Sequence, residues 1–142
     1  MQYFDSLLQY RDLGVLVLRL VVGYIFIYHG WPKLFGGKLA GMDINLKGFA
    51  GWLGSMGLPI PLVLAVIVSV VEVFGGLALV LGVGVQLAAG LLLVVMAVAS
   101  VLKKTKMGKQ FAGDGGYEFD LVLLAASVFL LLNGAGVYGF WR

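Results

Sequence analysis

Apolar residues fill four long stretches of this chain, and polar residues gather between them. Each stretch is close to the roughly 20 apolar residues that a helix needs to cross a membrane, and none shows the alternating pattern of a membrane β-barrel. The pattern therefore predicts an all-α integral membrane protein, a four-helix bundle that forms a single domain over residues 1–142. The expected spans cover about residues 13–30, 60–82, 85–102 and 119–138.

The segment between the first two spans has a helical pattern of its own. Within Leu46–Met56, the residues Phe49, Trp52, Leu53 and Met56 recur at spacings of three and four. This spacing predicts a short amphipathic helix that lies at the membrane interface. A loop packed over the bundle is the alternative interpretation.

Basic residues are divided unequally between the two sides that four spans define. The very short turn Gly82–Gly84 makes the second and third spans an antiparallel hairpin, so both termini share its side of the membrane. Seven lysines lie in the loops 31–59 and 103–116, against Arg11 and Arg142 on the other side. The positive-inside rule then places both long loops in the cytoplasm and both termini outside the plasma membrane.

Composition agrees with this assignment and limits the chemistry. The chain is 61% hydrophobic and 12% charged, with a mean hydropathy of +1.04, whereas a soluble domain is about 45–50% apolar and about 25% charged. It has no cysteine, which excludes thiolate ligation of a metal. Its single histidine excludes haem held by two histidines of this chain and makes a metal site built from this chain alone improbable. The basic loops suit anionic lipid headgroups better than nucleic acid.

Two charges lie well inside the apolar stretches, Arg19 in the first and Glu72 in the second, while Asp120 lies only at the start of the fourth. An ionisable group at this depth is costly and normally faces the interior of a bundle. Counted from the side of the membrane that carries the termini, the two residues differ in depth by about 6 Å at 1.5 Å per residue. We therefore expect Arg19 and Glu72 to pair or to share one polar network. Such a pair either fixes which helices are neighbours or lines a ligand or proton site.

A second polar cluster is expected at the cytoplasmic face, where the first span ends and the fourth begins. A histidine beside a carboxylate can carry protons or hydrogen-bond a quinone carbonyl, so this cluster is the candidate for quinone binding or proton relay. The alternative is an interfacial histidine that only caps a helix end. The cluster comprises Tyr28, His29, Trp31 and Lys33 from the first span and Tyr117, Glu118 and Asp120 from the fourth.

Four segments occur in an order and spacing typical of one known family: LRLVVGYIFIYHGWPKLFG, GFAGWLGSMGLPIP, VEVFGGLALVLG and GGYEFDLVLLAAS. On these segments, from about Leu16 to Leu132, the chain resembles the DoxX family of small four-helix membrane proteins. An arginine in the first span, here Arg19, is also typical of that family. The resemblance singles out His29, Gly30 and Lys33, then Glu72, Gly75 and Gly76, and finally Gly116, Tyr117 and Glu118.

The resemblance implies a subunit of a membrane-associated oxidoreductase complex. The family is named for a component associated with a terminal quinol oxidase, and the related DoxD protein is a subunit of thiosulfate:quinone oxidoreductase. Because the chain holds no redox centre of its own, we expect other membrane subunits or further copies of this chain as partners, and quinone as the cofactor. Its ring would lie near Tyr28, Trp31 or Phe35, and its oxygens near His29, Lys33 and Glu118. Whether the chain itself catalyses a reaction is left open by the resemblance.

Two other functions fit the same residues. The first is a non-catalytic accessory or assembly subunit, which docks through glycine-lined faces such as that of Gly75 and Gly76 and uses its polar residues for packing alone. The second is a small oligomeric transporter, suggested by Arg19 and Glu72 at mid-depth. The pair of broken helices typical of transporter sites is not evident in this sequence.

Overall fold

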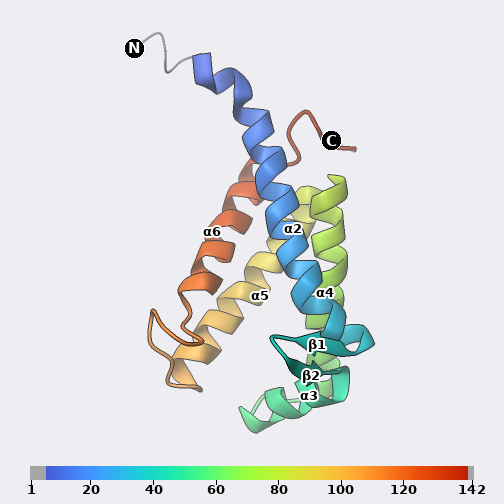
Figure 1. The fold of residues 1–142 in the computed structure, drawn as a ribbon, viewed down its shortest axis with the longest axis vertical. Coiled ribbons are helices and arrows are strands. Elements are labelled where there is room, and N and C mark those ends of the chain that lie inside the picture. The colour runs from blue at the N-terminus through green and yellow to red at the C-terminus, as the bar shows by residue number, and fades with distance from the viewer. Residues whose placement is uncertain (1–5, 141–142) are drawn as a thin grey trace.

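The computed structural model describes residues 6–140 and confirms the all-α prediction (Figure 1). Long helices pack side by side, and the short elements lie at their ends. The helices are η1 (Ser6–Tyr10, a 3-10 helix), α2 (Arg11–Phe35), α3 (Leu46–Ser55), α4 (Pro61–Leu81), α5 (Val85–Thr105) and α6 (Glu118–Asn133).

Helix α2 is longer than the sequence pattern predicted. The expected span ended near Gly30, but the helix continues through Pro32 to Phe35. Its end is closed by Gly36, whose backbone adopts a φ of 81° and whose N–H donates to the Pro32 carbonyl at 3.0 Å. The extension matters because Lys33 lies on a helix and not in a loop.

A small β-hairpin follows α2 and was not anticipated. Strand β1 (Gly37–Leu39) pairs antiparallel with β2 (Met42–Ile44), with Lys38 opposite Asp43. The turn between the strands uses the left-handed region at Ala40 (φ 49°) and Gly41 (φ 81°), as tight hairpin turns require. Three-residue strands are too short to give a two-residue alternation that sequence reasoning could detect.

Helix α3 confirms the helix expected within residues 46–56. Asn45 caps its first turn, because its side-chain oxygen accepts a hydrogen bond from the Gly48 N–H at 2.8 Å. The helix buries Ala50 and Leu53 against Ala65 of α4, in a small cluster apart from the main core. The position of α3 at the membrane interface stays a prediction.

Three helical stretches are long and apolar enough to cross a membrane: Leu7–Phe35, Pro61–Leu81 and Val85–Thr105. Helix α6 ends at Asn133 and not near Tyr138 as expected, and it has 16 residues. That is about 24 Å of helix, which is shorter than the hydrocarbon core of roughly 30 Å. The protein is therefore an all-α membrane protein, and a complete fourth crossing by α6 stays a prediction.

The helices form two tightly packed pairs. Helix α2 packs mainly on α4, and α5 mainly on α6, whereas α2 and α6 touch little. The first pair is closest where Gly23 meets Gly76: a Cβ at either glycine would lie 2.6 Å from the other's carbonyl oxygen. Small residues allow this close approach of helix backbones inside a membrane.

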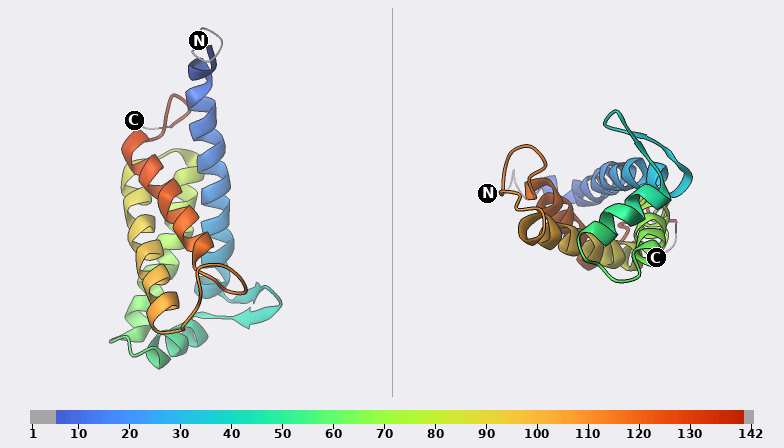
Figure 2. Two further views of the ribbon diagram at one scale, coloured as in Figure 1. Left: turned by 90° about the vertical axis from the view of Figure 1, so that its left-hand side faces the viewer. Right: turned by 90° about the horizontal axis from the view of Figure 1, so that it is seen from below.

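The two ends of the bundle differ in structure. One end carries the turn between α4 and α5, the start of α2 and the end of α6, and we call it the Gly82 end. The opposite end carries the hairpin, α3 and the loop 106–117, and we call it the α3 end (Figures 1 and 2). The first and last described residues thus lie at the same end, as predicted for an even number of spans.

One apolar core joins both helix pairs, and it extends unevenly along the bundle. Its fully buried members include Leu79 and Leu92 and reach Val15 and Val85 at the Gly82 end. Toward the α3 end, its last fully buried members are Phe26 of α2, Met96 of α5 and Leu123 of α6. Beyond them, buried polar side chains come together, and these form the candidate site.

Candidate functional site

Glu72 and Lys33 form an ion pair between α4 and α2. The Lys33 Nζ lies 2.7 Å from Oε1 and 2.6 Å from Oε2 of Glu72. Glu72 is 3% exposed, and the side chain of Lys33 is also mostly enclosed. Two hydrogen bonds to one buried carboxylate neutralise a charge that the apolar surroundings would otherwise destabilise.

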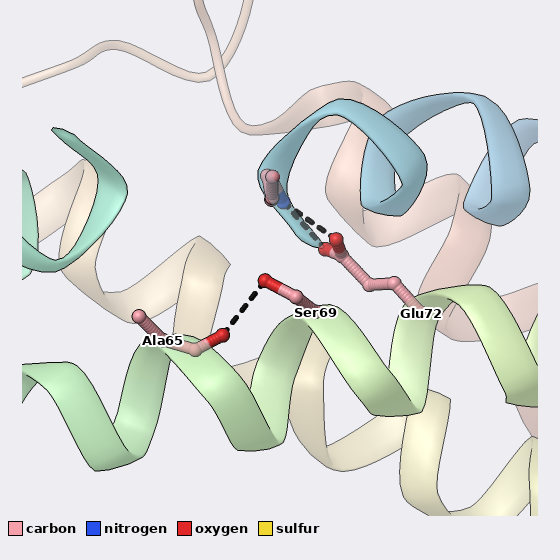
Figure 3. Close-up of polar contacts among 4 residues, drawn as sticks. Ala65, Ser69 and Glu72 are labelled. Atoms are coloured by element: carbon pink, nitrogen blue, oxygen red, sulfur yellow. Dashed lines mark hydrogen bonds and ion pairs between the residues drawn. The ribbon is translucent and has the colours of Figure 1, made fainter. Parts of the chain in front are cut away.

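Packing around this pair explains why it forms. Gly30 lies at the same level as Glu72, since a Cβ on Gly30 would be 2.7 Å from the Glu72 Cβ. The centroid of the Phe49 ring lies 4.8 Å from the Lys33 Nζ, and the ring offers its face to the ammonium group. Glu72 points from α4 toward α2, while Ser69, one turn away, donates its hydroxyl to the Ala65 carbonyl at 2.7 Å (Figure 3).

A second ion pair joins α5 to α6. The Lys103 Nζ donates to Oδ1 of Asp120 at 2.9 Å and lies 2.8 Å from Oδ2. The contact with Oδ2 is electrostatic, because within residues 6–140 this buried oxygen receives no well-directed hydrogen bond. The Lys103 ammonium is thus close to both carboxylate oxygens but well aligned with Oδ1 alone, so Oδ2 has capacity to accept a further hydrogen bond.

His29 lies near both ion pairs. It is half-buried on α2, one helical turn before Lys33, and Lys33, Lys103 and Asp120 lie within electrostatic range of its imidazole. The two ion pairs and His29 together draw on α2, α4, α5 and α6. We call these five residues, His29, Lys33, Glu72, Lys103 and Asp120, the polar cluster.

Arg19 does not belong to this cluster, and the expected Arg19–Glu72 pair is wrong. Arg19 is 1% exposed, and its guanidinium donates to the carbonyls of Leu79 at 2.9 Å, Val80 at 3.3 Å and Ala135 at 2.5 Å. Leu79 is seven residues beyond Glu72 on α4, which is about 10 Å along the helix axis. Arg19 is therefore too far along the bundle to reach the Glu72 carboxylate.

The expectation that both charges face the interior is nevertheless confirmed. Arg19 satisfies it without a carboxylate, because the last carbonyls of α4 have no partners within their own helix. A guanidinium at the C-terminal end of a helix also interacts favourably with the helix dipole. Arg19 thus ties α2 to the end of α4 and to the segment that follows α6.

The aromatic residues proposed to contact a quinone ring lie on the outward face of α2. Tyr28, Trp31 and Phe35 are all more than half exposed. Trp31 and Phe35 contact each other, with ring centroids 4.5 Å apart, and the Tyr28 ring lies edge-on to His29 with centroids 5.8 Å apart. Tyr28 therefore connects the outward face to the polar cluster.

Tyr117 and Glu118 are not drawn into the polar cluster. Tyr117 is half-buried, and its ring packs edge-on against Phe111 of the preceding loop at 5.7 Å. Glu118 begins α6 and lines an open hollow with Phe111 and Phe119. Among the described residues, Glu118 is not one of the charged groups that act on His29.

Sequence reasoning missed the role of Lys103 and did not pair Asp120. Lys103 was assigned to a loop, whereas α5 continues to Thr105 and places Lys103 in its last turn. The available signal was a lysine at the end of one apolar stretch and an aspartate at the start of the next. Such charges at the facing ends of consecutive helices are suited to pair.

The sequence profile of the DoxX family matches residues 14–105. This range holds four of the five residues of the polar cluster, and Asp120 lies beyond it. The chain belongs to the DoxX family. The resemblance seen in the sequence motifs is thereby confirmed.

Two relatives extend this assignment over most of the chain. A Bacillus subtilis (strain 168) protein named "Putative oxidoreductase CatD" is 29% identical over 124 residues, which cover 87% of this DoxX chain and 81% of the relative. An uncharacterized protein of Haemophilus influenzae (strain ATCC 51907 / DSM 11121 / KW20 / Rd) is 34% identical over 137 residues, which cover 93% of this chain and 91% of the relative. No solved structure matches.

Proposed function

We propose that this DoxX protein is a subunit of a membrane oxidoreductase complex and binds a quinone headgroup beside His29 at the α3 end. The observation that carries the proposal is the polar cluster, in which two buried ion pairs lie near a half-buried imidazole. Both ion pairs are internally neutral, so a neutral ligand can enter the cluster without adding net charge. The name of the Bacillus relative supports an oxidoreductase context.

The hydrogen-bonding groups of the cluster fit a quinone or its reduced form. The His29 ring offers a donor nitrogen for a quinone carbonyl. Asp120 Oδ2 lies 2.8 Å from the Lys103 Nζ but receives no well-directed hydrogen bond within residues 6–140, so it offers an acceptor for a hydroxyl of the reduced ring. A quinone supplies redox chemistry when it is bound, while these side chains hold its oxygens and exchange protons with them.

Partners follow from what this chain contains. It has no cysteine, and the described residues include no group of three or more histidine, aspartate or glutamate side chains suited to a metal. The proposal therefore assigns electron delivery to another subunit of the complex. Its location is the cell membrane, with the α3 end in the cytoplasm.

Quinone binding to protein in lipid nanodiscs tests this function. Titration with decylubiquinone, read by tryptophan fluorescence quenching, is expected to saturate with the wild-type protein. His29→Gln should weaken binding about tenfold, which corresponds to 1.4 kcal/mol and to the loss of one hydrogen bond. Lys106→Gln, which removes an exposed charge from the same end of the bundle, is the control and should bind like wild type. Equal and non-saturating quenching in all three proteins would refute the proposal.

An accessory role is the second candidate, and one observation favours it. Lys33 with Glu72 and Lys103 with Asp120 already neutralise each other within the chain, so the cluster can serve packing alone. In that case His29→Gln leaves both complex assembly and the activity of the isolated complex unchanged. The transporter alternative loses its main support, because Arg19 and Glu72 do not share a site.

A further inference from the structure

The two helix pairs are joined differently at their two ends. Through the chain itself, α2 connects to α4, and α5 connects to α6, by loops at the α3 end. The single connection from one pair to the other is the short turn Gly82–Gly84. Covalently, the bundle is therefore hinged at the Gly82 end.

Hydrogen bonds between side chains or loops follow the same division. Within residues 6–140, those that cross from the α2–α4 pair to the α5–α6 pair all lie at the Gly82 end. They run from Arg19 to the Ala135 carbonyl, from Arg11 to the Asn133 side chain at 3.0 Å, and from the Phe140 N–H to the Gly82 carbonyl at 3.1 Å. Position 82 also requires a glycine, because a Cβ there would collide with the Arg19 guanidinium.

At the α3 end, each ion pair locks one helix pair and neither locks the two pairs together. Lys33–Glu72 joins α2 to α4, and Lys103–Asp120 joins α5 to α6. The buried residues of the apolar core shared by both pairs extend no further toward this end than Phe26, Met96 and Leu123. In Figure 1, α5 and α6 lean away from α2 and α4 toward this end.

We propose that the bundle opens between α2 and α6 at the α3 end, so that a lipid-soluble ligand reaches His29 and Asp120 sideways from the bilayer. Arg19 and its carbonyl partners hold the Gly82 end closed and act as the hinge. Helices α2 and α6 touch little, and the contact of α4 with α5 is also smaller than the contacts within either pair, so opening at this boundary breaks fewer contacts than separation within a pair would. Opening leaves both buried ion pairs intact, which avoids the cost of separating buried charges.

The chemistry of the entrance indicates the class of ligand. The outward faces of α2 and α6 are apolar, with Tyr24 at 64% and Val122 at 64% exposure, so lipid hydrocarbon faces the boundary between these two helices. The polar cluster offers the His29 imidazole and Asp120 Oδ2, which lies beside the Lys103 ammonium and has capacity to accept a further hydrogen bond. A ligand that matches both has a small ring with hydroxyl or carbonyl groups and an apolar tail that remains in the bilayer. This inference rests on the proposed function for the identity of the ligand, but not for the opening itself.

Distance measurements between spin labels test the opening directly, because a chain without cysteine accepts labels only where cysteines are introduced. Val63→Cys on α4 with Val122→Cys on α6 reports the α3 end, and Leu81→Cys with Leu132→Cys reports the Gly82 end. All four side chains are exposed and lie outside the polar cluster. In lipid nanodiscs, we expect a broad distance distribution for Val63–Val122 that shifts on addition of decylubiquinol, and a narrow, unchanged one for Leu81–Leu132.

Two further arms make the outcome decisive. Tail-free benzene-1,4-diol should shift the Val63–Val122 distribution far less than decylubiquinol, since a ligand without a tail does not enter from the bilayer. If the Arg19→Lys variant folds, it should broaden the Leu81–Leu132 distribution. If it does not fold, the two label pairs in the otherwise wild-type chain still decide between opening and no opening. An equally narrow and unmoved distribution at both ends overturns the opening, even where decylubiquinone binds. A broad Val63–Val122 distribution without any quinone binding supports the opening and refutes the proposed function instead.

Discussion

Lys33 is the partner of Glu72, and both carboxylate oxygens of Glu72 lie within 2.7 Å of the Lys33 Nζ. The sequence alone suggested that Glu72 would pair with Arg19, but the two residues do not meet in the structure. Glu72 belongs to a polar cluster at the α3 end, whereas Arg19 ties backbone carbonyls at the Gly82 end. The two groups therefore have different roles, one at the candidate site and one at the hinge.

Removal of Lys33 should strongly destabilise the protein. Lys33→Met leaves the buried Glu72 carboxylate without a partner, which costs about 3–5 kcal/mol for a broken buried pair. The double variant Lys33→Met/Glu72→Gln removes both charges and should recover most of this loss. Unfolding in detergent micelles measures the free energies. Lys106→Met is the control, because Lys106 is exposed, and an equally small effect of Lys33→Met would show that the ion pair contributes nothing.

The contact between α2 and α4 should not tolerate a methyl group at Gly23. A Cβ at this position would lie 2.6 Å from the Gly76 carbonyl oxygen, so Gly23→Ala forces the helices apart and should destabilise by about 1–3 kcal/mol. Gly14→Ala on the same helix has nothing within 4 Å. It should be neutral or slightly stabilising, since alanine exceeds glycine in helix propensity by about 1 kcal/mol. Matching losses for the two variants, measured by unfolding in micelles, would contradict this packing.

A lysine should not replace Arg19. Three nitrogens of the Arg19 guanidinium each donate to a different carbonyl. The lysine side chain is shorter and ends in a single ammonium nitrogen, which cannot reach all three carbonyls. Arg19→Lys should cost on the order of 3 kcal/mol, because hydrogen bonds from charged groups contribute about 1.5–3 kcal/mol each.

The control for Arg19 is the other arginine of α2. Arg11 is exposed and makes one hydrogen bond, to Asn133, so Arg11→Lys should cost about 1 kcal/mol or less. Thermal unfolding of both variants in micelles gives the comparison. If Arg19→Lys unfolds at the temperature of Arg11→Lys, Arg19 is not the tie described above.

The predicted topology can be tested with single cysteines and a membrane-impermeant maleimide. Lys38→Cys and Lys109→Cys should react only from the cytoplasmic side, and Leu8→Cys and Val137→Cys only from outside. Labelling of intact cells and of inverted vesicles separates the two cases. Reaction of Lys109→Cys and Val137→Cys from the same side would show that α6 does not cross the membrane. Reversal of all four positions would overturn the positive-inside assignment but not the four crossings.

Local pattern was enough to predict much of the fold. The apolar stretches predicted the bounds of α4 within one residue and those of α5 within three. This was possible because a helix that crosses a membrane needs a continuous apolar stretch of a set length, which can be seen in the sequence. The spacing of Phe49, Trp52, Leu53 and Met56 predicted α3 for the same kind of reason. That Arg19 and Glu72 face the interior also followed from the cost of a charge exposed to lipid.

Pairing of the charges was decided by the tertiary structure. Which residues stand level depends on where two helices cross, and this is set by the close approach of Gly23 and Gly76, a contact between positions 53 apart in the chain. If α2 were displaced along α4 by two or three helical turns, the same sequence would place Arg19, and not Lys33, level with Glu72. The sequence by itself therefore determined that these charges are buried and in which helices, while only the packing of those helices determined which charges meet.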